Sequence, residues 1–528
     1  MSDSLSSAKL VRDKKPTVLI IMDGWGIAPA SAGNAITSAK LPVYNKLLKK
    51  YAWTTLRASG KAVGLPAGQD GNSEAGHMNI GAGRLVEQDA VVISKSIDNG
   101  TFFRNPAFTG AIAHAKKNKS AVHLVGMITA NQSAHSDPDH LISLIILLSR
   151  SKVKNIYLHL FTDGRDSPKF LAQKIMDSFK GFFANYVTVA TVMGRFYGMD
   201  RKKEWSRTEL AYNAMVLGEG IHEHTAQDAV LHAYARGESD EFIKPTVIVD
   251  DQDKPVGLIS DNDSVIFFNL RSDRARQMCK PFVQENFEQA NKGSFKRQVK
   301  PKNLFMVAMT DFGPDLGDLI TAFPSREIPD SLPMALRKYR QLAIAENEKY
   351  AHVTYFFNGG YADPVAGEKR VIIKSPDMKV YDDAPAMSLE VVTKVVVEGI
   401  EKQQYDFITM NIANPDMIAH TGNLGATIKA CEYTDVALGK IIDATLKRDG
   451  LVIVTADHGN AEEVINIETG EVDTEHSNNP VPFIVVKKGP LPKLRASGKL
   501  GDVAPTILQL LGEPKPKLMT GKTLLERS

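Results

Sequence analysis

Short apolar runs rich in Val, Ile, Leu and Phe recur along the chain, and they constrain its fold more than any other feature. Each run has the length of one strand and is apolar throughout instead of at alternate positions, which is typical of strands covered on both faces. We expect buried strands at residues 17–22, 121–127, 155–161, 187–193, 264–270, 303–309, 352–357, 407–412, 451–456 and 482–486.

Longer stretches with helical patterns separate these runs, among them LISLIILLSR (141–150) and ATIKACEYTDVALGKIIDATLKR (426–448). Strands that alternate with helices form βα units, whose strands pair in parallel. The sequence therefore predicts an α/β protein with parallel sheets.

The chain is long enough for several domains. Its 528 residues correspond to about two to four domains. The segment ITAFPSREIPDSLPMALRK (320–338) carries three prolines and has the composition of a linker, and the glycine-rich GAGRLVEQD (81–89) is a second candidate boundary. Two such crossings predict that one domain is inserted into another.

Composition excludes several classes of partner. The formal net charge is only +3 and the lysine pairs are scattered, so we expect no nucleic-acid binding. The longest apolar stretch is about half of a membrane span, so we expect no membrane insertion. Only Cys279 and Cys431 are present, which suits a reducing compartment, and we expect a cytoplasmic protein. The sequence has no exposed heptad repeat and no long apolar edge that would require a partner subunit, so we expect a monomer.

Polar and charged clusters follow the predicted strands. Asp23 follows the run at 17–22, TDGRD follows 155–161, and DHGN follows 451–456. In open α/β sheets, ligands bind outside the carboxyl ends of the strands. The clusters therefore predict a ligand site built from several strand ends.

One set of residues has the chemistry of metal ligands. Asp416 and His420 are four residues apart, so both side chains lie on one face of a helix, and Asp457 and His458 are adjacent after a strand. Each pair alone is weak evidence. The whole set mixes oxygen and nitrogen ligands, which favours manganese, zinc, cobalt or iron over calcium, and it predicts a two-ion site of the kind used in phosphoryl transfer. Its members are Asp23, Ser73, Asp416, His420, Asp457, His458 and His476.

Ser73 lies in QDGNSEAGHMN (69–79), between two glycines that permit close approach to the backbone. A serine hydroxyl is a poor nucleophile unless a base or a metal ion weakens its bond to the proton. His77 lies one helical turn further on, where a packing role is favoured over a role as base. A metal ion, with the N-terminus of a following helix, is the second candidate helper.

A second set of residues has the chemistry of an anion site. Its arginines follow several strand ends, and a guanidinium grips carboxylates and phosphates through paired hydrogen bonds. The set predicts a small anionic ligand. It comprises Arg165, Asp166, Arg195, Arg201, Arg271 and Arg274. Lys349, just before the run at 352–357, is expected in solvent by its position alone.

These motifs resemble those of the cofactor-independent phosphoglycerate mutases, a family of the alkaline phosphatase superfamily. The resemblance covers almost the whole chain. It is carried by MDGWG, GLPAGQDGNSEAGHMNIGAGR, HSDPDH, DGRDSP, GRFYGMDR, NLRSDRARQ, EKYAHVTYFFNGG, NPDMIAHTGN, TADHGNAE, EHSNNPVPF, GDVAPTILQLLG and MTGKTLL.

The resemblance implies two α/β domains. An alkaline-phosphatase-like metal domain would be built from both chain ends, residues 1–88 and 321–528, and a transferase domain that binds the substrate would be inserted at 89–320. It also implies two divalent ions, with manganese or cobalt favoured and zinc, iron or magnesium as alternatives. One ion would bind Asp416, His420 and His476, and the other Asp23, Ser73, Asp457 and His458.

The resemblance further implies the glycolytic and gluconeogenic interconversion of 3-phosphoglycerate and 2-phosphoglycerate, independent of 2,3-bisphosphoglycerate. Ser73 would carry the phosphoryl group as phosphoserine, and Asp166 would act as base on a glycerate hydroxyl. Substrate contacts would come from His135, Arg165, Asp166, Arg195, Arg201, Arg271, Arg274 and Lys349.

Two other classes of function fit parts of the pattern. A phosphomonoester hydrolase or another phosphomutase would share the metal residues, but a hydrolase needs no arginine cage to retain the alcohol. A metal-stabilised binding protein would be expected to lack Ser73 or a ligand, and every one is present. The mutase is therefore the favoured interpretation.

Overall fold

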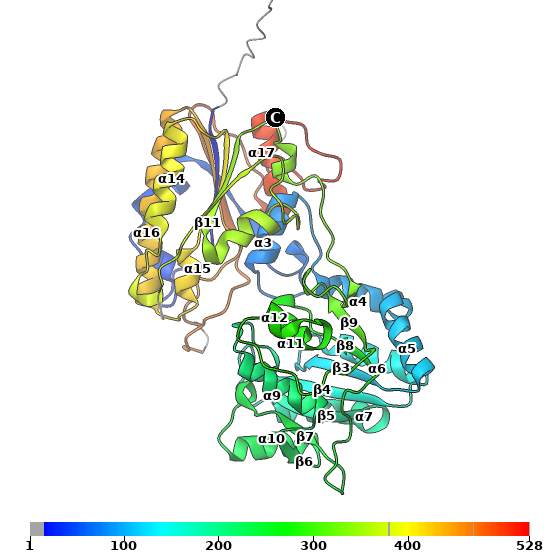
Figure 1. Ribbon diagram of the computed structural model, residues 1–528. Coiled ribbons are helices and arrows are strands. Elements are labelled where there is room, and N and C mark those ends of the chain that lie inside the picture. Colours follow the sequence, from blue (N-terminus) through cyan, green and yellow to red (C-terminus); the bar gives the residue numbers. More distant parts are fainter. Residues whose placement is uncertain (1–14, 132, 378–380, 468, 527–528) are drawn as a thin grey trace, which may run out of the picture. The chain divides into compact units, whose positions relative to one another are not determined.

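The computed structural model describes residues 15–131, 133–377, 381–467 and 469–526 (Figure 1). The chain forms two compact units. Unit 1 contains the chain through Gln88 and again from Arg326 onward, and unit 2 spans Asp89–Ser325. Each unit has its own eight-stranded sheet, so the predicted α/β class is confirmed. None of the described helices is long and apolar enough to cross a membrane.

Five neighbouring strands of the unit 1 sheet, from β12 (Lys369–Ile373) to β14 (Leu451–Thr455), are parallel, and β15 (Val481–Val486) runs antiparallel to both of its neighbours. The strand β1 is buried at every position, as its continuous apolar sequence predicts. The strands, in spatial order, are β12 (Lys369–Ile373), β11 (Gln341–Glu346), β13 (Phe407–Ile412), β1 (Thr17–Met22), β14 (Leu451–Thr455), β15 (Val481–Val486), β2 (Ala52–Arg57) and β16 (Ser497–Lys499).

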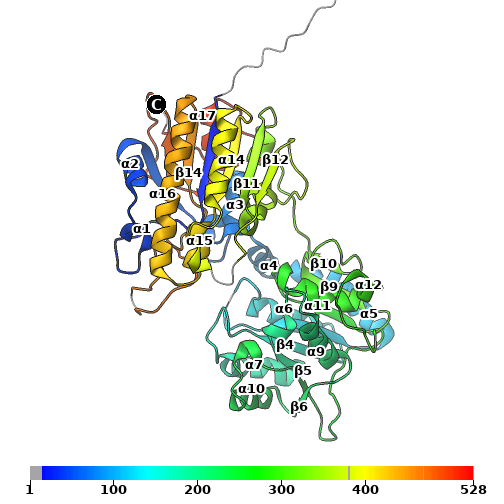
Figure 2. The same ribbon diagram turned by 60° about the vertical axis from the view of Figure 1, so that its left-hand side comes forward.

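Helices cover both faces of this sheet. Figures 1 and 2 show α14 (Leu389–Glu401) and α16 (Leu424–Lys447) side by side on one face, with α3 (Ser73–Ala82) and α17 (Val503–Leu511) on the other. The shorter helical segments of unit 1 are α1 (Ala35–Ser38), α2 (Pro42–Lys50), η1 (Gly60–Val63), α13 (Leu332–Ala335), η4 (Asn347–Lys349), η5 (His352–Phe356), η6 (Tyr381–Asp383), α15 (Asn414–Ala419) and η7 (Leu500–Asp502).

The sheet of unit 2 is also mainly parallel, with β7 antiparallel to β5. Its strands, in spatial order, are β10 (Ile320–Phe323), β9 (Phe305–Thr310), β8 (Ser264–Phe267), β3 (Val122–Met127), β4 (Ile156–Thr162), β5 (Thr188–Gly194), β7 (Thr246–Ile248) and β6 (Ile221–Glu223).

Alternate residues of these strands face two separate cores. Ile266 belongs to one core and Phe267 to the other, so both faces of the sheet are buried. The helical segments of unit 2 are α4 (Asp89–Asp98), η2 (Phe102–Arg104), α5 (Pro106–Asn118), α6 (Pro138–Arg150), α7 (Ala172–Tyr186), α8 (Arg195–Gly198), α9 (Trp205–Val216), α10 (Ala226–Ala235), η3 (Asp240–Phe242), α11 (Ser272–Val283) and α12 (Phe287–Ala290).

Two predictions about local structure were wrong. The run at 352–357 is not a strand but a π-helical segment, η5, which packs against α3: a side chain at Gly81 would meet the carbonyl of Phe357. Tertiary packing outweighs the strand propensity of its β-branched and aromatic residues. The segment at 320–338 is not all linker, because it contains strand β10 and helix α13 on either side of the crossing at Ser325 and Arg326.

A row of hydrogen-bonded polar side chains crosses the buried interior of the unit 2 sheet. Nε2 of His123 lies 3.1 Å from Asp263, and Nδ1 of the same ring lies 2.9 Å from Nε2 of His159. Nδ1 of His159 in turn lies 3.0 Å from the hydroxyl of Thr191. With both rings neutral, each nitrogen has one partner of the right kind. Burial, with His123 alongside, lowers the pKa of His159 well below its ordinary value.

We expect this row to make the stability of unit 2 sensitive to acid. The unfolded chain protonates His159 near its ordinary pKa of 6.5, whereas the folded chain does not. The contribution of His159 to the free energy of unfolding is therefore complete above about pH 6.5. It falls as the pH falls below that value, by up to about 1.4 kcal/mol per pH unit for one such group. We expect the thermal unfolding midpoint to fall less between pH 7 and pH 5 in His159→Gln, whose amide retains a donor and an acceptor. Equal losses in both proteins would contradict this role.

Candidate active site

Four neighbouring parallel strands of unit 1, β11, β13, β1 and β14, end at one edge of the sheet. The segments that follow them carry most of the predicted metal residues and Lys349, because the carboxyl ends of parallel strands meet at the same edge. Asp23 follows β1, Asp416 lies in α15 after β13, and Asp457 with His458 follows β14. The prediction that strand ends bring these side chains together therefore agrees with their observed positions.

Ser73 is the first residue of α3 and is 6% exposed. Asn72 caps this helix by accepting a 2.8 Å hydrogen bond from the backbone N–H of Ala75. The hydroxyl oxygen of Ser73 lies 2.8 Å from Nζ of Lys349 and 2.9 Å from Nε2 of His458. It also lies 3.2 Å from a carboxylate oxygen of Asp23. A helix N-terminus and an ammonium thus lie beside one hydroxyl, and both favour its negatively charged form.

Lys349 is buried, so the expectation from its position in the sequence was wrong. It is 5% exposed, at the end of η4 that follows β11, and its Nζ lies 2.7 Å from both Asp23 and Asp416. Burial disfavours its ammonium, but the carboxylates of Asp23 and Asp416 outweigh burial and raise the pKa of Lys349 above its ordinary value. The lysine therefore supplies a fixed positive charge beside Ser73.

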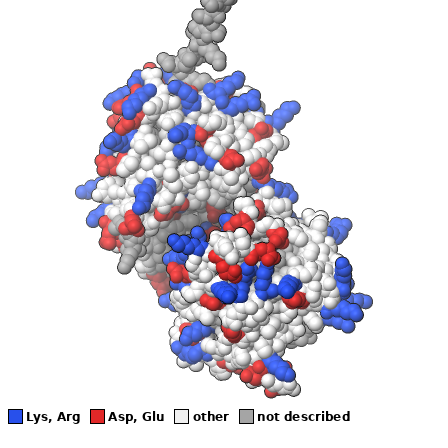
Figure 3. Space-filling view, in the orientation of Figure 1, with Lys and Arg blue, Asp and Glu red and all other residues white. Residues whose placement is uncertain are grey.

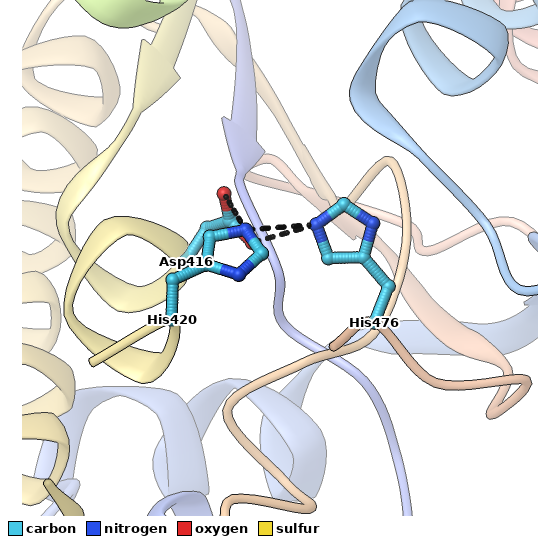
Figure 4. A group of neighbouring side chains, drawn as sticks. All are labelled: Asp416, His420 and His476. Atoms are coloured by element: carbon cyan, nitrogen blue, oxygen red, sulfur yellow. Dashed lines mark hydrogen bonds and ion pairs between the residues drawn. The ribbon is translucent and has the colours of Figure 1, made fainter. Parts of the chain in front are cut away.

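Asp416, His420 and His476 form the first group of metal-type side chains (Figure 4). Nδ1 of His420 lies 2.7 Å from the carbonyl of Thr474, and Nδ1 of His476 lies 2.8 Å from the carbonyl of Gly71. A carbonyl only accepts, so both Nδ1 atoms carry the proton.

The two Nε2 atoms of His420 and His476 then face each other, 3.1 Å apart, as lone pairs in the neutral rings. They lie 3.5 and 3.3 Å from the carboxylate of Asp416. Two lone pairs and a carboxylate that converge on one point fit a divalent cation, with the two carbonyls orienting the rings from behind.

Two further groups of metal-type side chains share Asp23, which lies with Asp416 and His458 in one and with His77 and Asp457 in the other. One oxygen of Asp457 is buried and accepts no hydrogen bond from any described residue, although Nδ1 of His77 lies 3.2 Å away. Nε2 of His458 lies 3.4 Å from this oxygen and 3.4 Å from Asp23. A buried carboxylate oxygen without a hydrogen bond carries a large desolvation cost, and this site fits a cation in the same way as the first.

His77 orients neighbouring groups rather than the reactive hydroxyl. Its Nδ1 donates to the backbone carbonyl of Ser73 at 2.9 Å, and its Nε2 accepts from the amide of Asn411 at 3.1 Å. Both ring nitrogens are thus engaged away from the serine hydroxyl. Of the two interpretations left open by the sequence, the geometry favours packing and orientation over a role as base.

The glycines around Ser73 permit close approach. A Cβ atom on Gly76 would lie 2.6 Å from the carbonyl of Asp457, and one on Gly71 would lie 2.7 Å from Cβ of His458. Only glycine therefore lets α3 and its preceding loop approach the segment that follows β14.

Unit 2 carries the predicted anion-binding residues, again at strand ends. The parallel strands β3, β4, β5 and β8 lie side by side, and His135, Asp166, Arg195 and Arg271 follow them in that order. The predicted site residues therefore fall into two sets, a metal-type set in unit 1 and an arginine-rich set in unit 2.

Arg195 is the centre of the unit 2 set. Its side chain is 3% exposed, and one guanidinium nitrogen lies 2.5 Å from Asp163 and 2.6 Å from Asp166. A second nitrogen lies 3.1 Å from Nε2 of His135, which is itself 3.1 Å from Asp166. Burial alone would raise the pKa of Asp166, but the hydrogen bond with His135 and the charge of Arg195 hold it well below its ordinary range.

The remaining arginines are more exposed. Arg201 and Arg271 both contact Asp273, and Arg165 lies 3.5 Å from Glu241. Burial, together with the like charges of Arg201 and Arg195, lowers the pKa of Arg274 to about 10. Neighbouring guanidinium groups that repel one another favour a bound anion. Figure 3 shows acidic and basic side chains interspersed on its face of each unit, without a continuous basic stripe.

This fold and the buried carboxylate and imidazole groups define a metal-dependent enzyme, and residues 15–515 match the Metalloenzyme superfamily. The chain is 46% identical over 521 residues to 2,3-bisphosphoglycerate-independent phosphoglycerate mutase 1 of Methanosarcina acetivorans, covering 98% of this chain and 99% of the relative. The chain belongs to the family of 2,3-bisphosphoglycerate-independent phosphoglycerate mutases, which are isomerases.

Two further relatives agree with this assignment. The 2,3-bisphosphoglycerate-independent phosphoglycerate mutase of Clostridium kluyveri is 45% identical over 517 residues, covering 97% of this chain and 100% of the relative. A crystal structure of Leishmania mexicana phosphoglycerate mutase at low cobalt concentration has a TM-score of 0.80 and 29% identity, covering 98% of each chain. The resemblance expected from the motifs is confirmed.

Proposed function

We propose that this enzyme interconverts 3-phosphoglycerate and 2-phosphoglycerate in glycolysis and gluconeogenesis, without 2,3-bisphosphoglycerate, and that Ser73 carries the phosphoryl group between the two hydroxyls. One observation carries this proposal. The hydroxyl of Ser73 lies at the start of α3, within 3.2 Å of Lys349, His458 and Asp23.

The proposed metal sites follow from these groups of side chains in unit 1. Asp416, His420 and His476 would hold one divalent ion, and Asp23, Ser73, Asp457 and His458 the other. When bound, the ions supply Lewis acidity that weakens the serine O–H bond and neutralises charge on the phosphate oxygens. The mixed oxygen and nitrogen donors favour manganese or cobalt, with zinc, iron or magnesium as alternatives. Unit 1 would then be the phosphatase-like domain and unit 2 the substrate-binding, transferase domain.

The residues would act in two half-reactions. In the first, the Ser73 oxygen bonds to phosphorus, the bond from phosphorus to one glycerate oxygen breaks, and that oxygen gains a proton as the serine loses one. In the second, Asp166 takes the proton of the other glycerate hydroxyl, whose oxygen attacks the phosphoserine and releases Ser73. A base must be ionised at neutral pH, and Arg195 with His135 keeps Asp166 in that state.

Lys349 would stabilise the phosphoryl group and the alkoxide of Ser73 through its fixed charge. The substrate carboxylate and hydroxyls would be held by His135, Arg165, Arg195, Arg201, Arg271 and Arg274, since guanidinium groups pair with carboxylate and phosphate oxygens. Such anchoring retains the glycerate while the phosphoryl group is on Ser73.

An assay of the purified protein with each phosphoglycerate, with and without added 2,3-bisphosphoglycerate, tests the proposed reaction. We expect conversion in both directions at rates that the added bisphosphoglycerate does not change, because the substrate itself is the phosphoryl donor. Release of inorganic phosphate as the main product would instead support a hydrolase. A strict requirement for bisphosphoglycerate would overturn the phosphoserine mechanism.

We also propose that the enzyme is a cytoplasmic monomer. Cys279 and Cys431 are both free and buried, which is compatible with a reducing compartment. Size-exclusion chromatography with light scattering would measure the mass directly, and a dimer mass at micromolar concentration would contradict the monomer.

A further inference from the structure

Glu462 is a buried carboxylate that no metal or substrate role explains. It is 2% exposed and accepts hydrogen bonds from four donors. One oxygen lies 2.9 Å from the backbone nitrogen of Gly26 and 2.8 Å from that of Asn460. The other accepts from the hydroxyl of Ser477 and, at 3.1 Å, from the amide of Asn479. All of its partners donate, as a carboxylate requires.

Two glycines leave the space that this carboxylate occupies. A Cβ atom on Gly26 would lie 2.2 Å from Glu462, and one on Gly459 would also lie 2.2 Å from it. Two separate segments thus carry glycine where a side chain would displace the Glu462 carboxylate. This fit makes the position of Glu462 specific.

The partners of Glu462 belong to the segments that carry the metal-type side chains. Gly26 follows Asp23 in the loop after β1. Asn460 donates from its side chain to Asp416 at 2.8 Å, and Ser477 is the residue after His476. One carboxylate therefore connects the segments of both proposed metal sites.

We infer that Glu462 is a positioning residue that fixes the spacing of the metal-binding segments, an inference that rests on the metal sites of the proposed function. Outer groups of this kind orient metal ligands, and their loss typically weakens metal binding by about 10- to 100-fold. Glu462 acts through Asn460, Ser477 and the Gly26 backbone, and none of its hydrogen-bond partners among the described residues is a proposed metal ligand.

Glu462→Gln is the informative change. A glutamine has the same shape but presents one NH₂ group, so two of the four donors would face another donor whichever way the amide is turned. We expect binding of Mn²⁺ to chelator-treated protein to weaken by about 10- to 100-fold by titration calorimetry. We also expect a changed visible absorption spectrum with Co²⁺, because that spectrum reports ligand geometry.

Asp435→Asn is a matched control. Asp435 is also a buried carboxylate of unit 1, 2% exposed, and it accepts from the backbone nitrogens of Val43 and Tyr44 at 3.0 and 2.6 Å. It joins α16 to α2, and both of these donors lie outside the proposed metal-binding segments. We expect this variant to lose stability while its Mn²⁺ affinity and Co²⁺ spectrum stay those of the wild type.

The outcomes separate the inference from the proposed function. If the wild type binds no Mn²⁺ or Co²⁺, the proposed metal sites fail. If the wild type binds both and Glu462→Gln binds them with unchanged affinity and spectrum, the positioning role is overturned. If Glu462→Gln does not fold, Ser477→Ala is the second variant to test, because it removes one of the four donors to Glu462 in the residue next to His476. A Co²⁺ spectrum in that variant identical to the wild type would equally overturn the inference.

Discussion

Replacing Ser73 with alanine is expected to lower the rate of phosphoglycerate interconversion by about a thousandfold or more. The change removes the oxygen that would carry the phosphoryl group. Lys349 is held as an ammonium between two carboxylates, so its nitrogen has no lone pair for attack. The measurement is a coupled assay of initial rates with saturating 3-phosphoglycerate.

Two controls make this result specific. Ser38→Ala changes an exposed serine at the end of α1 and should leave the rate unchanged. Ser73→Ala itself should retain most of its bound metal and its thermal unfolding midpoint, because the carboxylates and imidazoles of both proposed metal sites remain. Near-normal turnover in Ser73→Ala would rule out the phosphoserine route.

Much of the fold could be predicted because the central strands are buried on both faces. The run at 17–22 became β1, which is buried at all positions, and the run at 407–412 became its parallel neighbour β13. The strand β12, by contrast, lies at a sheet edge with only partial burial, and its sequence lacks a continuous apolar run. Weakly buried edge strands carry little signal in a single sequence.

The wrong assignment of a strand at 352–357 also led to the wrong prediction that Lys349 is exposed to solvent. The strand in this region is β11, at 341–346, and η4 follows it directly. Had the buried sequence QLAIAE been recognised as a strand, Lys349 would have appeared at a strand end like the other site residues. The error in the strand therefore produced the error in the exposure of the lysine.

The supporting residues could not be predicted because their roles depend on contacts between distant segments. Asn411 is an interior position of a buried strand, yet its amide lies 2.6 Å from Asp23, which is 388 residues away in sequence. Asp163 lies in TDGRD, a sequence typical of a turn, and nothing in that sequence indicates that its carboxylate binds the guanidinium of Arg195. Sequence position shows which residues end a strand, and only the packed structure shows which side chains meet there.

Removing divalent metal is expected to abolish activity, and adding manganese or cobalt is expected to restore it. A serine hydroxyl is a poor nucleophile near neutral pH, and the proposed ions would supply the Lewis acidity that weakens its O–H bond. Treatment with a chelator followed by buffer exchange gives the metal-free protein, and elemental analysis checks its metal content. Full activity in protein shown to be metal-free would contradict the mechanism.

The metal-free protein is expected to stay folded, and Lys349 is the reason. Its ammonium lies 2.7 Å from Asp23 and from Asp416, so these two buried carboxylates keep a positive partner when no ion is bound. Leaving them unpaired would cost several kcal/mol, because a buried charge without a partner is strongly destabilising. Lys349→Met removes this partner, so its unfolding midpoint should fall much further on chelation than that of the wild type. Equal falls in the two proteins would show that the lysine does not stabilise the metal-free state.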